Sequence, residues 1–127
     1  MLVGGAIVVA AALFMVLRDG ENSDTGNAPS ASEKPGNTPV IEMEGGQPVG
    51  GPRILRFATG DVVAFTVIPD SSIEEVHVHG YDLSKMAKGS RPLRFSFDAD
   101  LEGSYEIEAH AISGAATPIA TLEVRPR

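Results

Sequence analysis

Two of the three histidines in the chain stand two residues apart, in the stretch EEVHVHGYD at residues 74–82. On a strand, His77 and His79 project to the same side, about 7 Å apart along the backbone, so both imidazoles can reach one ion. Imidazole is a ligand for copper, zinc, nickel and iron. Because two ligands hold a metal poorly, a third must come from elsewhere; the candidates are His110, the thioether of Met86, and the carboxylates of Glu75, Asp82 and Glu108.

A metal-free interpretation of these residues stays open. The histidines can simply line the solvent-facing side of a strand, or hydrogen-bond the turn at Gly80. The paired carboxylates at positions 74/75 and 106/108 are most simply a solvated face. No serine lies in a G-x-S-x-G motif, and the glycines at 45, 46, 50 and 51 precede a strand rather than a helix. We find no catalytic constellation and expect a binding protein rather than an enzyme.

Composition limits the partners and the chemistry. The formal net charge of −7 argues against binding of nucleic acid or anionic lipid through a basic face. The chain contains no cysteine, so no disulfide supports the fold. Every thiolate-based metal site or nucleophile is excluded for the same reason.

The first part of the chain differs from the rest. Residues 1–17, MLVGGAIVVAAALFMVL, carry no charge and would form a helix of about 25 Å, the short end of what spans a bilayer core. We expect a transmembrane anchor, with a signal peptide as the main alternative and a buried helix as the least favoured one. Both leading interpretations place the remainder outside the cytoplasm. Residues 18–38 are rich in Gly, Ser, Asn and acidic residues, and we expect a disordered linker there.

From residue 39 onward, short alternating runs are separated by Gly, Pro, Asp and Ser. This pattern of short alternating runs predicts an all-β domain over residues 39–127, arranged as a two-sheet antiparallel sandwich. The domain shows no convincing amphipathic helix, and residues 81–87 are the only place for a helical turn. The seven expected strands cover residues 39–44, 53–58, 62–68, 75–79, 93–97, 104–111 and 119–124.

The alternation also assigns faces to the strands. In residues 75–79, Val76 and Val78 take the core side, so His77 and His79 share the other side with Glu75. In residues 104–111 the side chains expected to point inward are Tyr105, Ile107, Ala109 and Ala111; those expected to point outward are Glu106, Glu108 and His110.

Residues 60–126 resemble the cupredoxin-like domains of exported bacterial proteins, which include plastocyanin-like domains. The most specific part of the resemblance is EVHVHGYDL, followed by RFSFDADLEGSYEIEAH and IATLEVRP. The resemblance implies a Greek-key β-sandwich. It also places the two neighbouring histidines near the end of the sandwich where the family builds its metal site.

The resemblance departs from the copper-carrying members at two ligands. Ala109 stands where their Cys should be, directly before His110, and Pro118 stands near the position of their Met. A blue copper centre needs the thiolate, so we do not expect a blue copper electron carrier. The resemblance is compatible with two functions. One is a site for copper or zinc, with His77, His79 and His110 as ligands and Asp82 as a fourth ligand or an orienting neighbour. The other is a metal-free sandwich that binds another envelope protein.

Overall fold

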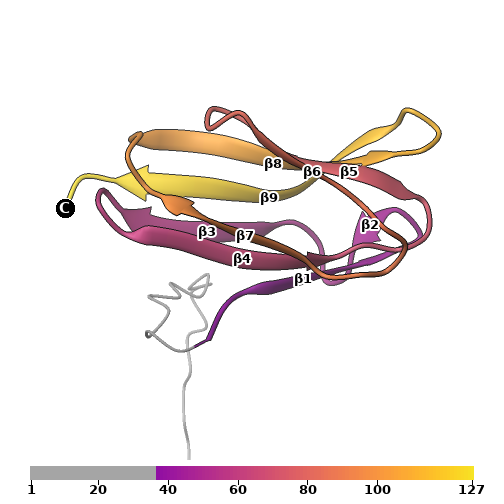
Figure 1. The fold of residues 1–127 in the computed structure, drawn as a ribbon. Coiled ribbons are helices and arrows are strands. Elements are labelled where there is room, and N and C mark those ends of the chain that lie inside the picture. Colours follow the sequence, from indigo (N-terminus) through magenta and orange to yellow (C-terminus); the bar gives the residue numbers. More distant parts are fainter. Residues whose placement is uncertain (1–36) are drawn as a thin grey trace, which may run out of the picture. The chain divides into compact units, whose positions relative to one another are not determined.

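The computed structural model describes residues 37–127, and every regular element in that range is a strand (Figure 1). No helix within these residues is long and apolar enough to cross a membrane. The expected anchor at residues 1–17 and nearly all of the expected linker at residues 18–38 lie outside the described residues. The strands are β1 Val40–Glu44, β2 Gln47–Pro48, β3 Arg53–Ala58, β4 Val62–Ile68, β5 Ile73–Val78, β6 Leu83–Met86, β7 Leu93–Asp98, β8 Gly103–Ala111 and β9 Ala116–Arg125.

The strands form two sheets, with orders β2-β1-β4-β7 and β3-β9-β8-β5-β6. Most neighbours are antiparallel, but β1 runs parallel to β4 and β3 runs parallel to β9. The expected all-β class is confirmed, whereas the expectation of purely antiparallel sheets is wrong because both sheets are mixed. Alternation within a strand reports which side is buried. It does not report which strand from a distant part of the chain lies alongside.

Residues 81–87, the only place that the sequence left for a helical turn, form no helix. Residues Leu83–Met86 form β6, which pairs with β5 in a hairpin that sets Val76 opposite Lys85 and His77 opposite Ser84. Gly80 (φ 80°) and Asp82 (φ 52°) turn the chain in the left-handed region, which glycine and aspartate tolerate best. The hairpin makes β6 the last strand of its sheet.

One core fills the space between the two sheets. Its centre contains Phe65 on β4 and Phe95 on β7, whose rings stack with centroids 4.7 Å apart. From the facing sheet come Val76 and Ile107, both fully buried. The inward positions expected in β5 and β8 are therefore confirmed for the valines, Ile107 and Ala109, while Tyr105 and Ala111 are only half-buried.

Tyr105 closes one end of this core and fixes the β5–β6 hairpin. A Cβ added at Gly80 would lie 2.1 Å from Tyr105 Cδ1, so the ring rests directly on the glycine. The Tyr105 hydroxyl donates a hydrogen bond to the carbonyl of Glu102 at 2.7 Å. The close contact positions the residue just before Gly80, which is His79.

Candidate metal centre

The polar cluster lies on the outer face of the five-stranded sheet, where β5 and β8 run side by side. Their antiparallel register sets His77 opposite Glu108 and Glu75 opposite His110. Residues directly opposite each other in such a pair project to the same face. Val76 and Val78, which alternate with the histidines, and Ile107 and Ala109, which alternate with the β8 residues, fill the inner face. Strand alternation therefore brings all three histidines of the chain to one surface.

Local backbone features set the direction of two of these side chains. The register of β8 against β9 shifts between Ile107 and Glu108, as in a β-bulge, and a bulge re-aims the side chain next to it. His79 comes one residue after β5 ends, and its backbone N–H donates to the carbonyl of Glu106 at 3.0 Å. The register shift and the hydrogen bond from His79 therefore act on the same short segment of β8, residues 106–108.

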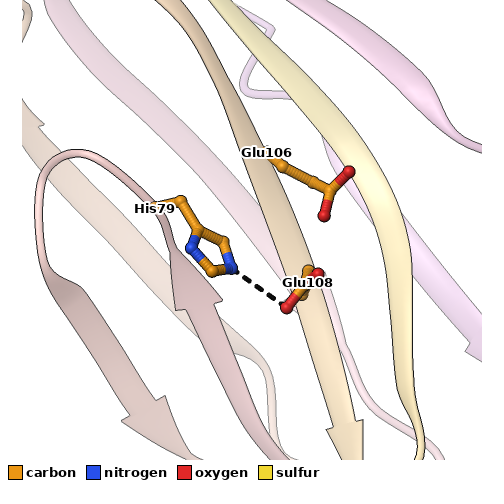
Figure 2. A group of neighbouring side chains, drawn as sticks. All are labelled: His79, Glu106 and Glu108. Carbon is orange, nitrogen blue, oxygen red and sulfur yellow. Dashed lines mark hydrogen bonds and ion pairs between the residues drawn. The ribbon is translucent and has the colours of Figure 1, made fainter.

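Glu108 is the centre of the cluster. Its Oε2 lies 3.0 Å from Nε2 of His79, a hydrogen bond shown in Figure 2, and 3.2 Å from Nε2 of His110. Its side chain is 19% exposed, less than that of either histidine. One carboxylate oxygen therefore stands between two imidazole nitrogens.

His110 has an unsatisfied nitrogen. Its Nε2 is closed to solvent and has no hydrogen-bond partner within the described residues, although Glu108 Oε2 is only 3.2 Å away, because the two groups are not aligned for a hydrogen bond. A buried polar atom left without a partner is costly. A cation between the two atoms would satisfy both.

The remaining sequence-predicted ligands lie further out. The His77 ring is 4.4 Å from the His79 ring and 6.3 Å from the His110 ring, measured between centroids. Its Nε2 is 3.9 Å from Oδ1 of Asp82, which is fully exposed. His77 thus borders the cluster and Asp82 lies at its outer side.

Within residues 37–127, the one set of three potential ligand residues with ligand atoms all within 4.8 Å of one another is His79, Glu106 and Glu108 (Figure 2). From the sequence, Glu108 was only one of several candidate carboxylates, and Glu106 belonged to an expected solvated face. The signal that could have found both is the pattern E-x-E-x-H at residues 106–110. That pattern gains meaning only when β8 is known to lie beside β5.

The two neighbouring carboxylates have different pKa values. A hydrogen bond with Glu108 raises the pKa of Glu106, and desolvation and the charge of Glu108 raise it further. The same hydrogen bond lowers the pKa of Glu108, and the hydrogen bond with His79 lowers it again. Glu106 therefore takes up a proton first, while Glu108 keeps its negative charge between the imidazoles.

These donors fit one class of metal site and not another. Neighbouring ligands of a tetrahedral ion at about 2.0–2.1 Å stand about 3.3 Å apart, close to the 3.0 Å between Glu108 Oε2 and His79 Nε2, and potential ligand atoms of His79, Glu106 and Glu108 all lie within 4.8 Å of one another. Imidazole with carboxylate suits Zn(II) or Cu(II). The chain has no cysteine, so the residues do not fit the blue copper centre of the copper-carrying cupredoxins.

The amino-acid sequence matches none of the known protein families and none of the curated proteins with which it was compared. An all-β fold of two facing sheets serves many unrelated functions. The function must therefore be argued from the side chains on the outer face of the sheet.

Proposed function

We propose that this chain is a membrane-tethered, extracytoplasmic protein whose cupredoxin-like domain binds one Cu(II) or Zn(II) ion on the outer face of the five-stranded sheet. The proposed ligands are His79, Glu106 and Glu108, with His110 and His77 beside them. The observation that carries the proposal is that potential ligand atoms of these three residues lie within 4.8 Å of one another, with Glu108 Oε2 3.0 Å from His79 Nε2 and 3.2 Å from the Nε2 of His110, which has no hydrogen-bond partner within residues 37–127.

The proposed role is to hold the metal for storage, delivery or detoxification. Metal binding requires neutral imidazoles and an ionised carboxylate, and the lowered pKa of Glu108 supplies the second of these. Glu106 adds a further negative charge next to the ion. The absence of a thiolate removes the tuned potential of a blue copper site, so electron transfer is not part of the proposal.

Sequence features support the proposed location and family. Residues 1–17 are uncharged and apolar, and residues 18–38 are polar and glycine-rich, as expected of an anchor and a linker. The resemblance of EVHVHGYDL and the segments after it supports a Greek-key, cupredoxin-like domain, and the two facing sheets agree with a β-sandwich in general. The proposal assigns the domain to the side of the membrane where exported metal-binding proteins act.

A metal-free role is the second candidate, favoured by the hydrogen bond between His79 Nε2 and Glu108 Oε2. In this alternative the histidines and Glu108 hold β5 and β8 together, and the domain binds a protein partner in the cell envelope. The two candidates differ in one measurable way. A metal ligand can be removed with loss of binding and little loss of stability, whereas a purely structural residue cannot.

Calorimetric titration of the full chain separates the two candidates. The protein is purified in a mild detergent because of its apolar first residues, and is titrated with Cu(II), Zn(II) and, as a control ion, Mg(II). We expect one Cu(II) or Zn(II) per chain with a Kd in the micromolar range or tighter, and no binding of Mg(II), which prefers oxygen ligands.

The decisive variant is Glu108→Gln, with Glu42→Gln as its matched control. Glu42 is an exposed glutamate on β1, in the other sheet. Loss of a ligand exceeds the 10- to 100-fold cost of losing a group that only orients one, so Glu108→Gln should weaken binding by at least about 100-fold. The control should bind as the wild type does. Absence of stoichiometric binding by the wild type, together with clear destabilisation by Glu108→Gln, would establish the metal-free role instead.

A further inference from the structure

The free edges of the two sheets meet beside the chain segment between β6 and β7. β6 is the last strand of the five-stranded sheet and β7 the last of the four-stranded sheet, and residues 87–92 join them (Figure 1). Lys85 Nζ donates a hydrogen bond to the carbonyl of Arg94 on β7 and lies 5.4 Å from the centre of the Phe95 ring. Beside these edges lies a groove of about 540 Å³, lined by Lys85, Met86, Lys88, Arg91, Pro92 and Leu93.

Charge is distributed unevenly around this groove. Residues 37–127 contain eight Lys and Arg against thirteen Asp and Glu, a net charge of −5. Four of the eight cations stand within residues 85–94, and no acidic residue lies between positions 83 and 97. None of the ion pairs found within residues 37–127 involves these four, which are Lys85, Lys88, Arg91 and Arg94.

The edge of β6 also offers unpaired backbone groups. Ala87 N donates to Glu74 O at 2.7 Å, so in the antiparallel ladder the alternate residues, Lys85 and Leu83, turn their N–H and C=O groups toward β5. Ser84 and Met86 turn theirs away from it. No strand lies on that side within residues 37–127. An extended peptide can pair with such a free edge and add a new strand to the sheet.

We propose that the groove binds an extended acidic segment of a partner protein, which adds as a strand to the edge of β6. Its backbone pairs with Ser84 and Met86, and its carboxylates face Lys88 and Arg91. Met86 is 56% exposed, and Leu93, which also lines the groove, is 8% exposed. An apolar residue of the segment packs there, since thioether side chains adapt to varied partners.

Two alternative roles for the cations predict different behaviour. A lysine on an edge strand can serve only to block pairing with other strands, in which case no peptide binds. A second copy of this chain is disfavoured as the occupant, because pairing two β6 edges would bring the same cations together. The complementary charge is therefore on a different molecule.

The test uses a fluorescein-labelled nine-residue peptide of alternating Glu and Val, with a Lys and Val peptide of the same length as its control. Fluorescence anisotropy is measured with the full chain at 50 mM and 500 mM NaCl. We expect the acidic peptide to bind, its affinity to fall with salt because exposed charges are screened, and the basic peptide not to bind. Equal binding of both peptides, tighter binding of a single-stranded oligonucleotide, or dimerisation through this edge in light scattering would overturn the proposal.

Two variants test the two parts of the proposed contact. Lys88→Glu with Arg91→Glu should weaken peptide binding at least about tenfold. The matched double variant, Arg53→Glu with Arg127→Glu, makes the same change of charge away from the groove and should bind within about twofold of the wild type. If both double variants lose binding equally, only the net charge matters and the groove has no role.

Ser84→Pro removes an outward N–H without removing a hydrogen bond to β5, which an edge strand tolerates. It should lower the affinity several-fold while the thermal unfolding midpoint stays near that of the wild type; unchanged affinity would mean that the peptide does not add as a strand. The outcome is independent of the metal proposal. Glu108→Gln should leave peptide binding intact, and the groove variants should leave metal binding intact.

Discussion

The two faces of the β5–β8 pair are made from alternate residues of the same two strands, yet they are held in place by different forces. The inner face consists of Val76, Val78, Ile107 and Ala109, each at most 1% exposed. The outer face carries the three histidines and Glu108, which contact one another in partly exposed positions. Packing fixes the first face, and hydrogen bonds and charge arrange the second.

The difference separates stability from chemistry. A fully buried aliphatic side chain contributes about 1.5–3 kcal/mol to folding, whereas ion pairs at exposed sites contribute about 0–1 kcal/mol. The proposed metal binding, which replaces a hydrogen bond such as His79–Glu108 on the outer face, should therefore cost the fold little. The inner face holds the two strands in the register that makes this exchange possible.

The largest effect that this comparison predicts is on the inner face. Ile107→Ala removes a fully buried side chain and should lower the free energy of unfolding by about 2–5 kcal/mol. Glu108→Gln, one residue away on the outer face, should change it by less than about 1 kcal/mol. Urea denaturation of both variants checks the contrast. Equal losses of stability would mean that the outer face is as structural as the core.

The next prediction concerns the turn between β5 and β6, where one substitution should lower both the stability and the metal affinity. Gly80→Ala places a Cβ against the Tyr105 ring at a backbone φ of 80°, and we expect a cost of about 2 kcal/mol or more from strain and displacement. Because His79 is the preceding residue, its imidazole should shift and metal affinity should fall as well. Calorimetry with Zn(II) beside urea denaturation measures both; loss of stability with unchanged affinity would show that the turn does not position His79.

The third prediction compares the effects of two histidines of the polar cluster on metal affinity. His79→Ala removes a proposed ligand and should weaken Zn(II) binding by at least about 100-fold, whereas His77→Ala removes a neighbour and should cost about tenfold or less. Both substitutions should leave the unfolding midpoint nearly unchanged. The reverse order of affinities would move the site toward His77 and Asp82, as the pair of histidines alone had suggested.

The sequence predicts the inner face well and the outer cluster only in part. Alternation places Val76, Val78 and Ile107 correctly because burial of a strand face depends on a period of two that any short segment displays. The role of Glu108 depends on β8 lying beside β5, a contact between residues 31 positions apart at His77↔Glu108. For the same reason the parallel pairing of β3 with β9 does not follow from the residues of one segment. Strand β6 is missed for a local reason: of its four residues only Leu83 is partly buried, so no alternation marks it as a strand.

The smallest effect concerns the proton that Glu106 and Glu108 compete for. Because the hydrogen bond with Glu108 raises the pKa of Glu106 above its ordinary value of 4.5, ionisation of Glu106 disfavours the folded state at neutral pH, and this penalty vanishes once the pH falls below that value. Glu106→Gln keeps a hydrogen-bond donor to Glu108 and removes the charge. Its Tm should therefore exceed that of the wild type at pH 7 and match it at pH 3.5, as measured by thermal unfolding in metal-free buffer with Glu42→Gln as the control. A Tm difference of the same size at pH 7 and pH 3.5 would contradict this prediction. Glu106 would then affect stability through packing, as residues of the inner face do, and not through its charge.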